Sequence, residues 1–259
     1  MLTHGLRPEG GIVGANLLYP PSRVQHAGVV LGLRGPADHP FIDSEPDRPG
    51  YMHRLQADQN YNVVTAACLL IRKSLYEEVG GLDEVNFTVS YNDVDLCLKA
   101  RQAGYLTVWT PYAVVMHEGS VSQNKVDKTA KEKKRQRFMA EQDVMYQKWL
   151  PLIANDPAYN PNLSLDNAGF ELVLDDPTRW QPLHWRPLPV VMPFALAKQP
   201  GSYPRLVSAL DTLRDARLME GVVSRRARNY VDIARIEPRA IIIQRPILPF
   251  MEARLQLST

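Results

Sequence analysis

Side chains that can move a proton or bind a metal ion gather between residues 83 and 117. Asp93 and Asp95 stand in the run Tyr-Asn-Asp-Val-Asp-Leu-Cys-Leu-Lys-Ala, Asp83 follows two glycines, and His117 follows an apolar run. A carboxylate can serve as a general base, and carboxylate oxygen and imidazole nitrogen bind divalent metals. The same residues also suit purely structural roles, because aspartates commonly cap helices and histidines often lie hydrogen-bonded at strand ends.

The elements before these aspartates are predicted to be a strand, a short helix and a turn. The apolar run from Val63 to Ile71 has strand length and predicts a buried strand. Leu75 and Val79 then follow at helical spacing, and the two glycines after them allow a turn with positive φ. The turn is expected either to close the helix or to border a binding pocket.

A second helix is predicted to carry Asp93 at its start. Asn92 or Asp93 is expected to cap it, and Gly104 is expected to end it. This position puts the Asp93 carboxylate near the positive end of the helix dipole, where an ionised carboxylate is favoured. Residues 105–109 and 113–116 then predict two short strands, the second of which ends at His117.

These segments occur in an order that is known from one enzyme family. Gly-Gly-Leu-Asp-Glu at 80–84 precedes the aspartate run at 91–100, and Thr-Pro-Tyr-Ala-Val-Val-Met-His-Glu-Gly-Ser follows at 110–120. The sequence resembles the C-terminal half of the catalytic domain of family-2 glycosyltransferases with the GT-A fold. The resemblance extends upstream through residues 11–20 and 24–32 and covers roughly the first half of the chain. It implies an α/β class, with a partial GT-A domain made of a mixed sheet and flanking helices.

The resemblance implies a role for each residue near the acceptor. In an inverting transfer a base must reach the acceptor hydroxyl, and Asp93 matches the family position for that base. Asn92 and Asp95 would orient the acceptor or brace the loop. Gly81 and Asp83 match the turn that borders the acceptor pocket in relatives. All four are therefore expected to bind substrate.

The resemblance also implies a divalent metal, Mn or Mg, for the complete enzyme. His117 matches a position that helps to hold this metal, which neutralises the diphosphate leaving group. In relatives an upstream Asp-x-Asp motif holds the metal, whereas the single Asp-x-Asp of this sequence, at 93–95, lies on the acceptor side. No glycine-rich phosphate loop replaces it. We therefore expect a truncated or separately encoded fragment, whose donor-binding half comes from a companion polypeptide.

The implied function is transfer of a hexosyl or deoxyhexosyl group, with inversion, from a nucleotide-sugar donor. The acceptor would be a growing surface polysaccharide or a lipid-linked glycan. A non-catalytic module that binds glycan or a partner is the main alternative. A metal-dependent hydrolase built from Asp83, Asp93, Asp95 and His117 is a further one, although the sequence lacks the close histidine spacing usual for such sites.

Composition sets outer bounds on these functions. With 259 residues, 45% of them hydrophobic and 22% charged, the chain is globular in type and has room for one large or two small domains. A net charge of +2 predicts no general attraction to nucleic acid. No apolar run approaches the ~18 residues of a membrane span, and the start lacks a signal-peptide pattern. Cys68 and Cys97 are expected to be buried reduced thiols, which favours the cytoplasm.

The basic run at 125–137 opens a predicted helix whose later part carries Phe138, Met145 and Trp149 on one stripe. The helix should dock by its second half and leave its first half in water. This basic half is either a solvated face or a contact with anionic lipid at the inner membrane surface.

The remaining chain is predicted to hold a linker and a small appendage. Residues 1–150 form the acceptor-side part of the glycosyltransferase domain, and 151–204 form a proline-rich linker. Residues 205–259 form an incomplete α/β segment that resembles the start of a second glycosyltransferase-like domain. Helices are expected at 205–217, 230–236 and 246–257, and a buried strand at 240–244.

Overall fold

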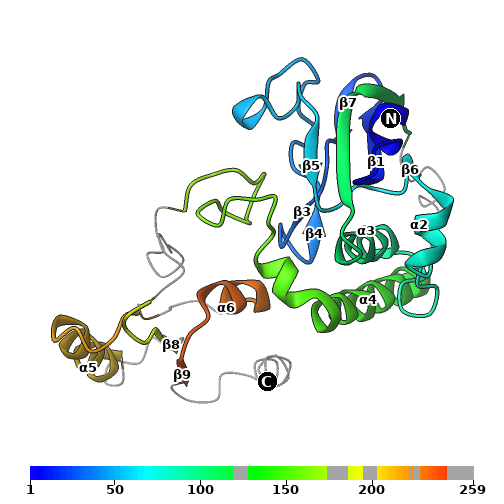
Figure 1. Cartoon of the computed structure of the whole chain (residues 1–259). Helices are drawn as coiled ribbons and strands as arrows, with labels where there is room; N and C mark the ends of the chain where they lie inside the picture. Colours follow the sequence, from blue (N-terminus) through cyan, green and yellow to red (C-terminus); the bar gives the residue numbers. More distant parts are fainter. Residues whose placement is uncertain (119–127, 174–185, 195–202, 222, 224–227, 244–259) are drawn as a thin grey trace. The chain divides into compact units, whose positions relative to one another are not determined.

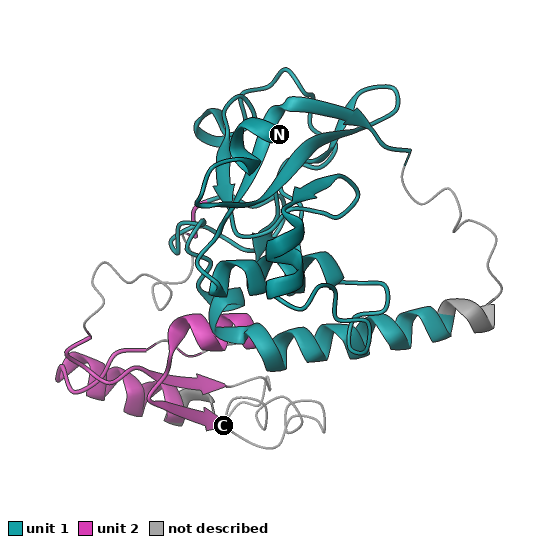
Figure 2. Cartoon of the chain, turned by 45° about the vertical axis from the view of Figure 1, so that its right-hand side comes forward, with its two compact units in different colours: residues 1–171 teal, residues 172–259 magenta. Residues whose placement is uncertain are grey.

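The protein was analysed as a computed structural model, which describes residues 1–118, 128–173, 186–194, 203–221, 223 and 228–243. The chain forms two compact units, Met1–Glu171 and Leu172–Thr259 (Figure 2). All the sequence-predicted site residues lie in the first unit, and each unit is described by itself.

The first unit combines one main sheet with helices that flank it (Figure 1). Its strands are β1 (Gly10–Tyr19), β2 (Arg23–His26), β3 (Val30–Leu31), β4 (Ala37–Asp38), β5 (Gln59–Tyr61), β6 (Leu69–Ile71) and β7 (Leu106–Met116). Its helices are α1 (Leu2–Gly5), the 3-10 turn η1 (Tyr51–His53), α2 (Lys73–Glu78), α3 (Asn92–Gln102) and α4 (Lys128–Ala154).

The main sheet is mixed and is organised around β1. Its order is β2-β1-β7-β5, and β6 also pairs with β1. β1 runs parallel to β7 and antiparallel to β2 and β6, while β5 is antiparallel to β7. Ile12, Val13 and Ala15 of β1 are fully buried, as expected for a continuous apolar strand covered on both faces. The predicted α/β class with a mixed sheet and flanking helices is confirmed.

Two helices form successive layers beside the sheet. α3 contacts β1 and β7, and α4 lies against the other side of α3, where Trp149 of α4 donates a hydrogen bond to Asp95 of α3 (Figures 1 and 2). Met145, Trp149 and Ile153 are buried at spacings of four residues, whereas Phe138 remains 42% exposed. The prediction that α4 docks by its second half is therefore confirmed.

Two local predictions differ from the structure. The strand predicted for 63–71 is reduced to Leu69–Ile71, because Val63 and Val64 are buried in a loop. Val64 lies so close to β1 that a side chain at Gly14 would approach it to 2.6 Å. The two strands predicted before His117 are one strand, β7, whose register shifts where residues 111–113 bulge between Thr110 and Val114.

The first unit continues beyond residue 150, where the linker was expected to begin. Asp156 is buried and accepts hydrogen bonds from the backbone of Leu31 and Ala158 and from the side chain of Asn62. Although these bonds oppose it, burial raises the pKa of Asp156. The segment after α4 is thus anchored to the strands that line the site.

The second unit contains β8 (Val191–Phe194), α5 (Tyr203–Asp215), α6 (Tyr230–Ile236) and β9 (Ala240–Ile243). β8 and β9 pair in parallel, and Val190, Met192, Phe194 and Ile236 form a buried cluster. The predicted helix 230–236 is confirmed, and the one at 205–217 is shifted by two residues. The expected burial of the 240–244 strand is wrong, because most of β9 is exposed. The helix predicted for 246–257 lies outside the described residues.

Two further sequence expectations concern cysteines and membrane spans. Cys97 is buried, and burial raises the pKa of its thiol to about 12. Cys68 is only half-buried, so the expectation of burial is wrong for that thiol. Among the described residues no helix is both long and apolar enough to cross a bilayer.

Candidate functional site

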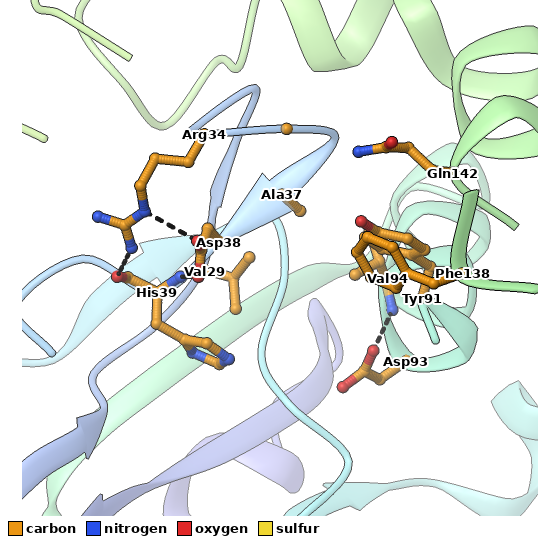
Figure 3. Close-up of a pocket in the computed structure, with 11 residues that line it drawn as sticks. Val29, Arg34, Ala37, Asp38, His39, Tyr91, Asp93, Val94, Phe138 and Gln142 are labelled. Carbon is orange, nitrogen blue, oxygen red and sulfur yellow. Dashed lines mark hydrogen bonds and ion pairs between the residues drawn. The ribbon is translucent and has the colours of Figure 1, made fainter. Parts of the chain in front are cut away.

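A cavity of about 320 Å³ opens beside the first turn of α3. This first cavity is lined by residues of β4, α3 and α4 and of the loops that flank β3, β4 and α3 (Figure 3). They are Val29, Arg34, Gly35, Ala37, Asp38, His39, Tyr91, Asp93, Val94, Phe138 and Gln142.

A second, smaller cavity of about 120 Å³ lies at the ends of β1 and β7. Its lining residues are Leu17, Tyr19, Gln25, His26, His39, Ile42, Thr65, Ala67 and His117. His39 lines both cavities, so its ring forms part of the wall between them. The second cavity contains His117, the residue expected to help hold a metal.

Asp93 lines the first cavity, as expected for a base that must reach a bound hydroxyl. Its carboxylate accepts one hydrogen bond from the backbone N–H of Ala66, at 3.0 Å, and one from that of Val94, at 2.9 Å. Figure 3 shows the Asp93 carboxylate facing the cavity opposite His39 and the β4 segment. The half-buried carboxylate is held in place and retains lone pairs for a ligand.

The backbone just before Asp93 has an unusual conformation. Tyr91 precedes the first turn of α3 with φ 62° and ψ 4°, the left-handed region that a bulky residue rarely adopts. No side chain caps this end of α3, so the predicted cap at Asn92 or Asp93 is wrong. The Asn92 side chain instead accepts a hydrogen bond from the Asp93 N–H, at 2.7 Å. It supports the first turn rather than lining either cavity.

Glu141 of α4 holds the loop that leads into this turn. Its carboxylate accepts hydrogen bonds from the backbone of Thr88, Val89 and Ser90 and from the Thr88 hydroxyl, at 2.7–3.3 Å. Burial raises the pKa of Glu141, but the hydrogen bonds from Thr88, Ser90 and Val89 outweigh it and leave the pKa below its ordinary value. These hydrogen bonds fix the conformation of the loop, and such contacts allow a strained residue such as Tyr91 to persist beside a site.

Asp95 does not line either cavity. Its side chain is fully buried, accepts a hydrogen bond from the Trp149 indole at 2.8 Å, and pairs with Lys148 at 2.6 Å and Lys99 at 3.3 Å. Substrate contact was predicted for Asp95, with bracing as the alternative role. The contacts correspond to bracing, since they join α3 to α4.

Gly81 and Asp83 form the turn after α2 and line neither cavity. Gly81 has φ +62°, and a side chain there would meet the Tyr76 ring at 2.9 Å. Asp83 accepts hydrogen bonds from the backbone of Val85 and Asn86 and from the Asn86 side chain, which lower the pKa of Asp83, with Asn86 the main cause. Both residues are thus engaged in local turn structure.

His117 makes a hydrogen bond through Nδ1 to Oε1 of Gln25, at 2.8 Å. An amide oxygen can only accept, so Nδ1 donates and Nε2 keeps a lone pair that is suited to a metal or a polar ligand. Within the described part of the chain, however, no three His, Cys, Asp or Glu side chains lie close enough to hold a metal ion. The residues present therefore do not form a metal site by themselves, and the divalent metal stays a prediction for the complete enzyme.

Part of the lining of each cavity lies in a segment that matches a known family, including Tyr91, Asp93 and Phe138 of the first cavity and Thr65 and His117 of the second. A family model described as glycosyltransferase like family 2 matches residues 48–138, from before η1 to the first half of α4. The match includes Asp93, His117 and Phe138. The matched segment therefore resembles glycosyltransferase family 2.

The chain is also similar to three curated bacterial proteins. The chain is 47% identical over 180 residues to the uncharacterized protein y4gI of Sinorhizobium fredii. It is 35% identical over 172 residues to the O-antigen biosynthesis protein RfbC of Myxococcus xanthus. It is 32% identical over 117 residues to N-acetylglucosaminyl-diphospho-decaprenol L-rhamnosyltransferase of Mycobacterium tuberculosis. No solved structure matches the chain.

These alignments cover 70%, 64% and 42% of the chain, respectively. They cover only 19%, 12% and 38% of the relatives. The chain therefore spans well under half the length of each relative that it matches.

Several residues of this site were missed or given no role by sequence reasoning. His39 was given no role, yet it lines both cavities and its Nδ1 lies 2.9 Å from Nδ1 of His26. Glu141 and Gln142 gave no signal at all. The stripe that includes Phe138 predicted packing, whereas this ring lines the first cavity.

Proposed function

We propose that this chain carries the acceptor and base side of an inverting sugar transfer. The donor is a nucleotide sugar, and the acceptor is a growing surface polysaccharide or a lipid-linked glycan. One observation carries the proposal: the Asp93 carboxylate, held by Ala66 and by the first turn of α3, faces a cavity large enough for a small ligand. The names of the relatives, an O-antigen biosynthesis protein and a rhamnosyltransferase, support glycan synthesis as the process.

The chemistry follows from this arrangement. An acceptor hydroxyl in the first cavity gives its proton to the Asp93 carboxylate as its oxygen attacks the anomeric carbon. The new carbon–oxygen bond forms on the face opposite the departing nucleotide, and the bond to the diphosphate breaks. The configuration at the anomeric carbon is thereby inverted. The second cavity adjoins the first through His39 and is the nearer of the two to His117, so it suits the donor side.

A transfer assay tests the role of Asp93. The complete enzyme, in which the donor-binding half accompanies this chain, is incubated with radiolabelled nucleotide sugars, a divalent metal and membranes that supply lipid-linked and polymeric acceptors, and label in glycan is counted. Replacing the base by Asp93→Asn should lower transfer by about 10²–10⁴-fold. Asp47→Asn, at an exposed site away from both cavities, is the matched control and should transfer like the native protein. Equal transfer by Asp93→Asn and the control would refute the proposal.

The donor-binding half is proposed to come from another segment or a companion polypeptide. The observation behind this proposal concerns the Asp-x-Asp motif at 93–95. Asp93 lines the first cavity and Asp95 is buried against Trp149, so both aspartates are engaged on the acceptor side. The chain alone should therefore bind uridine or thymidine diphosphate sugars only weakly. Tight, metal-dependent binding measured by calorimetry would contradict this.

A peripheral membrane contact is proposed for the first half of α4. Lys133, Lys134 and Arg135 are exposed there, as expected for a wet basic helix. Each basic residue near an anionic surface contributes about 1 kcal/mol of attraction. Replacing these three by Gln should reduce sedimentation with phosphatidylglycerol vesicles at low salt. Unchanged sedimentation would end the proposal.

A further inference from the structure

The cationic residue that lines the first cavity is already occupied by partners on the protein. Arg34 donates through Nε to Asp38 at 2.8 Å, through Nη2 to the His39 carbonyl at 2.9 Å, and through Nη1 to the Asn167 carbonyl. Asp38 in turn accepts the His39 N–H at 2.7 Å. The charges of Arg34 and Asp38 therefore cancel within the wall of the cavity (Figure 3).

Asp93 is the remaining charged group among the residues that line the first cavity. Within the described part of the chain no cation lies within ion-pair distance of it, and its carboxylate accepts hydrogen bonds from the backbone N–H groups of Ala66 and Val94. A phosphate or carboxylate in this cavity would meet the Asp93 charge with no cation free to pair with it. An uncharged ligand meets no such penalty.

The wall next to Asp93 is aromatic. Tyr91 and Phe138 lie 5.6 Å apart between ring centroids, with their planes tilted by 35°. Gln142 lines the same wall. A pyranose ring has an apolar C–H face and a rim of hydroxyls, so such a wall offers it dispersion contact and an amide partner. The loop that carries Tyr91 is held by Glu141, which makes this surface pre-formed.

We infer that the first cavity binds an uncharged sugar residue of the acceptor glycan, with its ring against Phe138 and Tyr91 and a hydroxyl directed at Asp93. This inference rests on the proposed function, because it assigns the acceptor side to this cavity. It predicts that the part of the acceptor that enters this cavity carries neither a carboxylate nor a phosphate.

The test compares two ligands that differ only in charge. Binding of methyl β-D-glucopyranoside and of methyl β-D-glucopyranosiduronic acid to the full chain is measured by saturation-transfer NMR titration at low salt. The neutral glycoside should bind at millimolar concentration, and the acid about tenfold more weakly because of the Asp93 charge. In Asp93→Asn the two affinities should differ by less than about threefold, since the repulsion is gone.

A matched pair of variants tests the aromatic wall. Phe138→Ala should weaken binding of the neutral glycoside by about three- to tenfold, the value of an aromatic contact. Met139→Ala removes a similarly exposed side chain from the next position of α4, which does not line the cavity, and should bind like the native protein. Both side chains are about half exposed, so both variants should fold, which far-UV circular dichroism checks.

Each outcome decides the inference. Equal or tighter binding of the acid, unchanged binding in Phe138→Ala, or no saturable binding of the neutral glycoside would overturn it. The proposed function fails differently, by unchanged transfer in Asp93→Asn. A protein that binds the neutral glycoside through Phe138 but keeps full transfer in Asp93→Asn would retain the sugar subsite and lose the assigned base.

Discussion

The Nδ1 atoms of His26 and His39 lie 2.9 Å apart in the wall that separates the two cavities. At this distance one proton serves both nitrogens, so one ring donates and the other accepts. The backbone N–H of Thr65 points at Nε2 of His26, at 3.5 Å. This contact favours a His26 tautomer that carries its proton on Nδ1 and donates it to His39. The pair is a neutral link between β2 and the loop after β4.

Acid should destabilise the protein through this pair. Burial, and then His39, lower the pKa of His26 well below 6.5, and burial lowers the pKa of His39. Unfolded imidazoles titrate near 6.5, so on acidification the unfolded chain takes up protons before the folded one does. The contribution to stability is therefore complete above about pH 6.5 and is lost as the pH falls from there toward the lowered values. Urea unfolding at pH 7.5 and 5.5 should give a lower free energy of unfolding at the acidic pH.

Variants separate this effect from other titrations. His39→Gln removes one ring of the pair and should reduce the difference in unfolding free energy between the two pH values. His53→Gln, at an exposed histidine, should leave that difference unchanged. Asp38 and Asp93 raise the pKa of His39 and Arg34 lowers it, so Asp93→Asn should enlarge the pH dependence slightly. A difference that is the same in His39→Gln and the native protein would show that the pair does not titrate as argued.

Glu141→Gln should loosen the start of α3. The carboxylate accepts from three backbone N–H groups, and an amide oxygen keeps part of these bonds without the charge, so we expect a loss of about 1–3 kcal/mol in unfolding free energy. The same loss should weaken glycoside binding, because the loop holds the Tyr91 ring. Urea unfolding and the NMR titration measure the two effects.

A second glutamate of α4 serves as the control for Glu141. Glu132 is exposed and pairs with Arg135 one turn along the helix, so Glu132→Gln should leave the unfolding free energy almost unchanged. Because the folded-state pKa of Glu141 is lowered, its contribution is present above its unfolded pKa and is lost only as the pH falls through the lowered value. Equal effects of Glu141→Gln and Glu132→Gln on the unfolding free energy would contradict the positioning role of Glu141.

Local patterns were enough to predict several elements of this chain from its sequence. The glycine stop of α3 and the helix at 230–236 each depend on neighbours in the sequence, and each was expected. The strand at 63–71 was overestimated, because Val63 and Val64 are apolar for a different reason, their close packing on Gly14. The family motif located Asp93, but His39 lies in a loop between turns, where no periodicity marks a buried ring.

Asp93 and Asp95 show most clearly what local sequence cannot predict. Both are acidic residues in the first turn of one helix, and local sequence gives them the same interpretation. Their fates differ because α4 packs against only one side of α3, and that contact depends on residues far along the chain. Lys148 and Trp149 cover Asp95, whereas Asp93 faces the cavity.

The two aspartates should therefore give opposite results when each is replaced by Asn. Asp95→Asn keeps an acceptor for Trp149 but leaves Lys99 and Lys148 without their buried anion, so we expect about 3 kcal/mol of lost stability. Asp93→Asn replaces a half-buried group without an ionic partner and should change stability by less than about 1 kcal/mol while it removes transfer. Urea unfolding of both variants, read beside the transfer assay, measures this contrast. Similar losses of stability in the two variants would mean that Asp93 is also a structural carboxylate, and the case for it as the base would weaken accordingly.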